Sequence, residues 1–217
     1  MQIDIYSDVV CPWCFIGKRR LEEALEITGY RDRAQISWHP FQLNPTMPKS
    51  GLNRRTYLDA KFGGAEARQA IEARVAKAGE TAGIVFTFDR IERTPNTFEA
   101  HRLMWLAQQQ GKQDELAEAL FHAYFSEGRD LANGQTLVEI ATEAGLDRAE
   151  VQRLLASDQG FEEVRGEERA GHRLGIRGVP YFVLNGTYAI SGAQPPDIFV
   201  SALQKAEVDR TERKVGR

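Results

Sequence analysis

The sequence predicts an α/β fold with a large all-helical insertion. Segments with the pattern of strands lie near both ends of the chain, whereas residues 44–173 carry apolar side chains at helical spacing. The length of 217 residues suits one large domain or one domain with an insertion. We therefore expect residues 1–43 and 174–217 to form one discontinuous domain and residues 44–173 to form a helical insertion domain.

The N-terminal part is expected to contain a strand, a helix and a second strand. Residues 2–6 form the first strand, and an apolar stripe predicts a helix that follows Cys11 and stops at Gly29. In the second strand, residues 35–41, apolar and polar side chains alternate. The expected helical stripe consists of Leu21, Ala24, Leu25 and Ile27.

The insertion is predicted to consist of several amphipathic helices. One helix stops at Gly145, a typical C-cap residue, and Asp147 through Glu150 resembles a capping box that starts the next. The apolar stripes comprise Ala100, Leu103, Met104 and Ala107; Leu116, Leu120, Ala123 and Tyr124; and Leu137, Ile140, Ala141 and Ala144.

The C-terminal part is expected to form a β-hairpin followed by a helix. Pro180 precedes a strongly strand-forming run, and Asn185-Gly186 is a preferred two-residue hairpin turn before a partner strand at residues 187–190. The last helix is entered at Pro196. It carries Phe199, Leu203 and Ala206 on one face.

Charge and hydropathy argue against nucleic-acid and membrane partners. The formal net charge is −3, from 28 basic and 31 acidic residues, which gives no basic footprint. Asp4 and Asp8 interrupt any apolar run of a secretory signal, and the apolar run at 179–184 is far shorter than the roughly 20 residues that span a bilayer. We therefore expect a cytoplasmic protein.

The chain has 2 cysteines, Cys11 and Cys14, and they are separated by Pro12-Trp13. In a reducing compartment such a pair is typical of metal or redox chemistry. A zinc site needs about four ligands, and the 4 histidines are scattered, with no two of them three to five residues apart. We expect no metal.

The position of the pair favours a working redox dithiol. Cys11 lies at a strand-to-helix junction, where unpaired backbone N–H groups and the helix dipole favour a thiolate. Pro12 suits the first helical turn because its missing N–H is not needed there. Cys14, one turn further on, can reach the sulfur of Cys11 and resolve a mixed disulfide.

Four segments in this order resemble the DsbA family of thioredoxin-fold proteins. Within that family the chain is similar to the FrnE-like branch, which is related to 2-hydroxychromene-2-carboxylate isomerases and kappa-class glutathione transferases. The resemblance covers essentially the whole chain. The segments are residues 7–18 around Cys11-Pro12-Trp13-Cys14, residues 95–102 with Pro-Asn-Thr and Ala-His-Arg, residues 175–183 with Gly-Val-Pro, and residues 190–194.

The resemblance implies a thioredoxin fold and assigns roles to matching positions. Cys11 would be the exposed nucleophile and Cys14 the buried resolving thiol. Pro180 would be a cis proline facing the dithiol, and Val179 would offer backbone hydrogen bonds to substrate. Some relatives carry a further cysteine pair near the C-terminus, which this sequence lacks, whereas kappa-type relatives usually have serine where Cys11 stands.

Two interpretations of the insertion residues remain open. In the first, Asn96, His101 and Arg102 line the groove opposite Cys11; in the second, the aromatic residues Phe98 and Trp105 on the face shared with His101 belong to the core, and His101 is a hydrogen-bonded buried residue. Pro12 and Trp13 are expected to contact substrate beside the cysteines. Lys18 either stabilises a thiolate or faces solvent.

Three functions are compatible with these features. The first is a thiol–disulfide oxidoreductase or dithiol–disulfide isomerase that acts on a disulfide-containing protein or a small thiol substrate and is recycled by glutathione or a cellular reductase. The second is a glutathione-dependent small-molecule isomerase or transferase, with glutathione as co-substrate. The third is a chaperone that uses apolar surface around Trp13, Phe15 and Pro180. No other cofactor is implied, and the protein is expected to be a monomer or homodimer.

Overall fold

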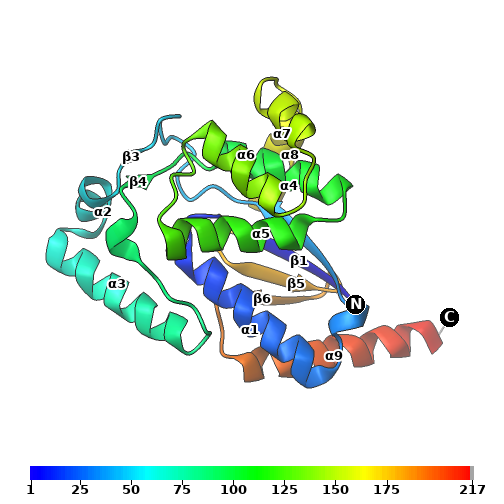
Figure 1. Ribbon diagram of the computed structural model, residues 1–217. Coiled ribbons are helices and arrows are strands. Elements are labelled where there is room, and N and C mark those ends of the chain that lie inside the picture. Colours follow the sequence, from blue (N-terminus) through cyan, green and yellow to red (C-terminus); the bar gives the residue numbers. More distant parts are fainter. Residues whose placement is uncertain (216–217) are drawn as a thin grey trace.

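The computed structural model describes residues 1–215, with side chains up to residue 212. Its centre is a four-stranded sheet in the order β2-β1-β5-β6 (Figure 1). β1 pairs with β2 in parallel and with β5 antiparallel, so the first strand of the chain lies inside the sheet. The strands are β1 (Gln2–Ser7), β2 (Gln35–Pro40), β5 (Tyr181–Leu184) and β6 (Tyr188–Ser191).

Helices from both ends of the chain pack together beside the sheet. In Figure 1, α1 (Pro12–Thr28) and α9 (Pro196–Val215) lie below it, and the insertion helices lie above it and to the left. The insertion comprises α2 (Arg54–Phe62), α3 (Ala65–Glu80), α4 (Phe98–Gln109), α5 (Gln113–His122), α6 (Gly134–Glu143), α7 (Arg148–Leu155) and α8 (Phe161–Arg173). The architecture is the thioredoxin fold with a helical insertion that the sequence predicts.

The limits of α1 follow from local chemistry. Cys11 is the N-cap residue and a proline occupies the first turn, where no N–H is needed. Gly29 ends the helix in the left-handed conformation, with φ of 65°. Leu21, one of the expected stripe residues, is buried, but Ile27 is 63% exposed. The assignment of Ile27 to the apolar stripe was wrong, because a residue two positions after the buried Leu25 points to the opposite side of a helix with 3.6 residues per turn.

Two irregular features interrupt the helical insertion. A short ribbon pairs β3 (Leu52–Asn53) with β4 (Arg93–Thr94), and two-residue strands are too short to show any sequence periodicity. After α5 the chain forms a π-helical turn over Ala123–Glu127. Such turns recur at functional sites. This one places Tyr124 and Phe125 against the dithiol end of α1, as described below.

The C-terminal hairpin forms at the predicted turn. Asn185 and Gly186 have φ values of 49° and 65°, as a two-residue turn with both φ values positive requires. The side chain of Asn185 accepts a hydrogen bond from the backbone N–H of Gln2 and donates one to the carbonyl of Ala206. The turn therefore ties the start of β1 to α9.

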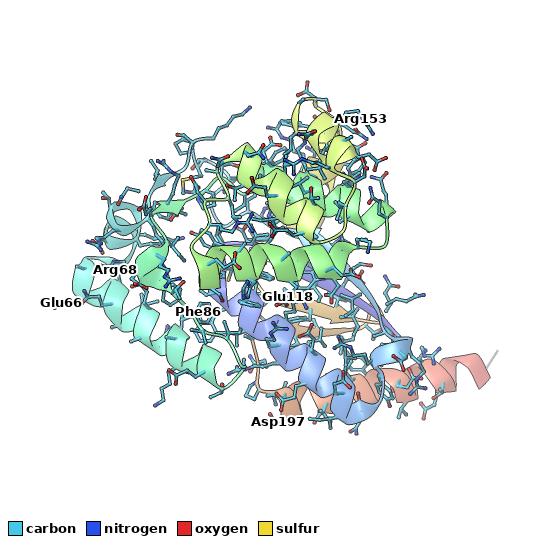
Figure 2. All side chains as sticks on the ribbon, in the orientation of Figure 1. Glu66, Arg68, Phe86, Glu118, Arg153 and Asp197 are labelled. Atoms are coloured by element: carbon cyan, nitrogen blue, oxygen red, sulfur yellow. The ribbon has the colours of Figure 1, made fainter. Side chains whose placement is uncertain are left out.

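An aromatic cluster joins the insertion to α1. The ring of Phe15 stacks on that of Phe121, with centroids 5.3 Å apart, and meets Phe86 edge-on at 6.3 Å. Figure 2 shows Phe86 between α3 and the body of the protein. Full burial of a phenylalanine stabilises a fold by about 1.5–3 kcal/mol. The cluster therefore holds the N-terminal end of α1, which carries the cysteines, against the insertion.

None of the helices within residues 1–215 has the length and apolar character that crossing a membrane requires.

Candidate functional site

The two cysteines lie at the N-terminal end of α1 as free thiols. Cys14 is 1% exposed and Cys11 only 5% exposed. The Cys11 thiol donates a hydrogen bond to the carbonyl of Val179, with sulfur and oxygen 3.6 Å apart. The expected burial of Cys14 is found, but the expected exposure of Cys11 is not, because insertion side chains roof the sulfur.

The segment before β5 approaches α1 closely. The Val179–Pro180 peptide bond is cis, and Pro180 is buried. A Cβ atom at Gly17 would lie 3.0 Å from the ring of Phe182 and 3.1 Å from Cγ of Pro180. Any side chain larger than hydrogen at this point of α1 would push the helix away from that segment. Gly17 therefore permits the contact that brings Val179 to Cys11.

The two thiols differ in their surroundings. Burial raises the pKa of Cys14 well above its usual range, and the adjacent Cys11 sulfur adds to the effect. The Ser7 hydroxyl and the backbone at Asp8 oppose it by stabilising the thiolate. Cys14 is therefore a protonated thiol at neutral pH and needs a proton acceptor before it can act as a nucleophile.

A cavity of about 370 Å³ opens at Cys11. Its volume lies within the range of small-molecule sites. Helices α2 and α3 supply one wall and the π-helical turn supplies another. Beside Cys11 it is bordered by Pro12, Trp13 and Val179, and its other apolar lining side chains include Met47, Leu58, Phe62, Ile71, Val75, Phe88 and Phe125.

Two of the charged residues that line the cavity form an ion pair. Arg54 binds Glu72 with nitrogen and oxygen 2.6 Å apart, and its guanidinium carbon lies 5.1 Å from the centroid of the Phe88 ring. The hydroxyl of Tyr124 donates to the carbonyl of Arg93, and burial raises the pKa of this tyrosine. The lining is therefore mostly apolar, with one ion pair in its wall and Asp8, Lys61 and Arg74 as further charged residues.

Three of the residues expected to contact substrate border the cavity beside Cys11, whereas Pro180, Asn96 and His101 do not. Pro12, Trp13 and Val179 border the cavity. Asn96 lies in a separate surface groove, where its amide donates to the carbonyl of Met47.

His101 is 5% exposed and borders another, smaller cavity, which neither cysteine lines. The reading that Asn96 and His101 line the groove opposite Cys11 was wrong, because α4 turns this face toward β2 and the loops.

Two basic side chains near the motif have structural roles. Arg102 is buried and donates hydrogen bonds to backbone carbonyls between α7 and α8. Lys18 is also buried, and its ammonium group binds Glu22, Asp114 and Glu118. Figure 2 shows Glu118 on α5 beside α1. The expectation that Lys18 either stabilises a thiolate or faces solvent was wrong, because its ammonium group is buried among carboxylates and does not border the cavity at Cys11.

The sequence reading gave no role to several residues that shape the site. Asp8 is 1% exposed, borders the cavity, and accepts a hydrogen bond from the N–H of Leu43 through Oδ2. The position of Asp8, three residues before Cys11, is visible in the sequence, and it is the one signal that could have indicated this site residue. Arg54, Glu72 and Tyr124 come from distant helices, and only the fold places them there. In the described part of the chain, no three potential metal ligands come together.

Comparisons with known proteins agree with this architecture. Over residues 2–204 the chain matches the family model described as a DSBA-like thioredoxin domain. It is 27% identical over 205 residues to the uncharacterized protein YwbO of Bacillus subtilis, covering 94% of this chain and 96% of that protein. It is 38% identical to a probable DsbA oxidoreductase from Streptomyces coelicolor of known structure, with a TM-score of 0.88, covering 95% of this chain and 89% of the other.

Two more distant structures share the fold. The cytosolic disulfide reductase DsbM from Pseudomonas aeruginosa, solved with GSH, has a TM-score of 0.67 at 20% identity and covers 94% of this chain and 98% of its own. A 2-hydroxychromene-2-carboxylate isomerase has a TM-score of 0.71 at 15% identity, with 99% of each chain covered. The match over residues 2–204, together with the fold and the dithiol at the start of α1, shows that this chain belongs to the DsbA-like thioredoxin-domain family.

Proposed function

We propose that the protein is a thiol–disulfide oxidoreductase or isomerase that uses Cys11 and Cys14 on protein or small-molecule disulfides. The observation that carries the proposal is the placement of two free thiols one helical turn apart, with the Cys11 sulfur beside the Val179 carbonyl and Cys11 in the lining of a cavity. Substrate, thiol and backbone acceptor can therefore meet at one point.

The proposed reaction has two exchange steps. The Cys11 thiolate attacks one sulfur of a substrate disulfide, forms a mixed disulfide and releases the first substrate thiolate. Cys14 then loses its proton and attacks the Cys11 sulfur, which closes the Cys11–Cys14 disulfide and releases the second substrate thiolate. Glutathione or a cellular reductase returns the dithiol to its reduced form.

Similar proteins support this assignment. The relative from Streptomyces coelicolor is described as a probable DsbA oxidoreductase. The neighbour from Pseudomonas aeruginosa is described as a cytosolic disulfide reductase. The proposal includes a cytoplasmic location, because the neighbour from Pseudomonas aeruginosa is described as cytosolic.

The test is a pair of cysteine variants mixed with oxidised glutathione and with a disulfide-containing protein. Cys11→Ser should abolish exchange, because the attacking thiol is gone. Cys14→Ser should accumulate mixed disulfides that mass spectrometry detects. Normal turnover by Cys11→Ser would exclude the mechanism. The equilibrium midpoint of the dithiol in glutathione buffers, followed by Trp13 fluorescence, then separates a disulfide donor from a reductase.

A second candidate function is a glutathione-dependent isomerase or transferase for small molecules. The roofed Cys11 and the apolar cavity of about 370 Å³ favour it, because a compact ligand fits this space. In that case Cys14→Ser would retain turnover when glutathione is present, since no resolving thiol is needed. Loss of turnover in this variant would leave the dithiol mechanism as the better explanation.

A further inference from the structure

The size of the cavity at Cys11 limits what can reach the sulfur. Cys11 is only 5% exposed, and the cavity that it lines measures about 370 Å³, with walls from α2 and α3. An enclosed space of about 150 Å³ is enough to bind benzene. The cavity therefore has room for about two ring-sized groups beside the thiol.

The lining favours an aromatic substrate over a peptide-like one. Phe62, Phe88 and Phe125 contribute rings, and Leu58 and Ile71 add aliphatic side chains. The rings of Phe88 and Phe125 meet edge-on with centroids 6.3 Å apart, so they present fixed aromatic surfaces. Aromatic pairs are favourable beyond the area that they bury. The peptide groups of oxidised glutathione would lose water against these side chains without gaining hydrogen-bond partners, which is costly.

The cavity also has a charge opposite to that of the whole protein. Its lining contains three basic and two acidic residues, although the chain has a formal net charge of −3. Arg54 and Glu72 pair with each other. Within the described side chains, neither Lys61 nor Arg74 forms an ion pair. Two cations of the lining are therefore available to an anionic ligand.

These two cations lie at the solvent side of the lining. Lys61 and Arg74 are exposed, and the ammonium group of Lys61 lies 5.5 Å from the ring centroid of Tyr57 and 5.9 Å from that of Phe62. Asp8, by contrast, is 1% exposed. An anionic group at the opening would therefore meet two cations, while the carboxylates of the lining are buried or paired.

We propose that the substrates of the dithiol are compact disulfides of aromatic thiols that carry an anionic group such as a carboxylate. The inference rests on the proposed thiol–disulfide exchange and names its substrate class. The rings would fill the apolar cavity with the disulfide at Cys11, and the anionic group would bind Lys61 and Arg74.

The reaction is balanced in atoms and electrons. The Cys11 sulfur forms a bond to one substrate sulfur as the substrate disulfide breaks, and the first aromatic thiolate leaves. The Cys14 sulfur then forms a bond to the Cys11 sulfur, and the second aromatic thiolate leaves. The dithiol is oxidised, the substrate is reduced to two thiols, and the two protons of the dithiol pass to the departing thiolates or to solvent. A thiol of low pKa is also a fast leaving group.

The test compares four disulfides as oxidants of the reduced wild-type protein. Dithiobis(nitrobenzoate) is aromatic and anionic, dithiodipyridine is aromatic and neutral, oxidised glutathione is anionic and not aromatic, and cystamine is compact and cationic. Rapid acid quenching and mass spectrometry count the free thiols that remain. Each rate constant is divided by that of the same disulfide with β-mercaptoethanol, which removes differences in intrinsic reactivity.

The expected order of the normalised rates follows from the lining. Dithiobis(nitrobenzoate) should exceed oxidised glutathione and cystamine by about tenfold or more, because it gains both ring contacts and charge pairing. Dithiodipyridine should fall between them, because it gains the ring contacts alone.

Two sets of variants separate the contributions of charge and aromatic surface. Lys61→Gln combined with Arg74→Gln should lower the normalised rate of dithiobis(nitrobenzoate) by about three- to tenfold and leave dithiodipyridine within about twofold. The matched control is Arg55→Gln combined with Lys77→Gln, because these exposed cations lie on the same two helices but outside the lining.

The aromatic contribution is tested at Phe62. This residue is 38% exposed, so its replacement leaves no gap in the core. Phe62→Ser should slow both aromatic disulfides by about two- to tenfold and leave oxidised glutathione unchanged.

Two results would overturn the assignment of the substrate class. One is a set of equal normalised rates for the four disulfides in wild type. The other is a loss with dithiobis(nitrobenzoate) that is no larger for the Lys61 and Arg74 pair than for the control pair. In either case exchange with oxidised glutathione would still support the proposed function. If Cys11→Ser consumes all four disulfides as fast as wild type, the proposed function itself is refuted, and the substrate class with it.

Discussion

Replacing Arg102 with methionine should destabilise the fold strongly without removing the dithiol chemistry. Arg102 is 2% exposed and lies on α4, far along the chain from its partners. Its guanidinium donates to the carbonyls of Leu154, Ser157 and Gln159 at 2.5 to 3.0 Å. One side chain therefore holds the connection between α7 and α8.

The magnitude follows from what each carbonyl would lose. The Leu154 carbonyl is buried, but it also accepts hydrogen bonds from the backbone N–H and the hydroxyl of Ser157, so it would keep partners. Ser157 and Gln159 are exposed, so water can replace the guanidinium at their carbonyls. Each of the three net losses is therefore about 0.5–1.5 kcal/mol, and their sum is about 1.5–4.5 kcal/mol. At about 2–4 °C per kcal/mol for a chain of this size, the melting temperature should fall by about 3–18 °C.

The assay is urea and thermal unfolding followed by far-UV circular dichroism. Arg153→Met is the matched control, because Arg153 projects from the outer side of α7 (Figure 2) and has one long contact, 3.8 Å, with Glu150. It should change stability by less than about 0.5 kcal/mol. A loss below about 1 kcal/mol for Arg102→Met would refute the anchoring role. Slower mixed-disulfide formation by the folded variant would restore the reading that Arg102 lines the groove.

Three further predictions concern pH, packing and thiol reactivity. Burial lowers the pKa of His39, but hydrogen bonds with two carboxylates outweigh this effect and raise the pKa above its unfolded value of 6.5. The stability that this adds is therefore fully present below about pH 6.5 and lost as pH rises through the folded pKa, so the unfolding free energies of wild type and His39→Gln should converge at alkaline pH. Gly79→Ala should destabilise the protein by about 1–3 kcal/mol in urea unfolding, despite better helix propensity, because the new Cβ would lie 2.4 Å from the Phe86 ring; a more stable variant would show that Phe86 moves freely. Cys14 should react with iodoacetamide far more slowly than Cys11 at pH 7, because burial raises the pKa of Cys14. Peptide mass spectrometry measures the labelling of each cysteine, and equal labelling would contradict this description of the site.

The sequence was most informative where local chemistry decides the structure. The turn at Asn185 and Gly186 and the end of α1 at Gly29 depend on backbone conformations that few residues adopt. The burial of Phe199 follows from helical spacing alone. These features need no knowledge of distant parts of the chain.

The site itself could be predicted only in part, because its walls come from distant segments. Periodicity places His101 on one face of α4, but it cannot say whether that face meets the cavity at Cys11 or packs toward β2. The roof over Cys11 has the same origin, since α2 and α3 reach it only through tertiary packing. Lys18 illustrates the same limit, because two of its three carboxylate partners lie on α5.

The position of β1 inside the sheet bears on how the protein forms during translation. The ribosome makes β1, both cysteines and β2 early, whereas β5 and Val179 follow only after the entire insertion. During that interval one edge of β1 has no neighbour, and an open strand edge is prone to pair with other chains. The local contacts of the insertion helices can form meanwhile, because they close short loops. Cys11 therefore emerges into solvent well before its roof is complete, and the newly made chain carries a dithiol that is more accessible than the one in the finished protein.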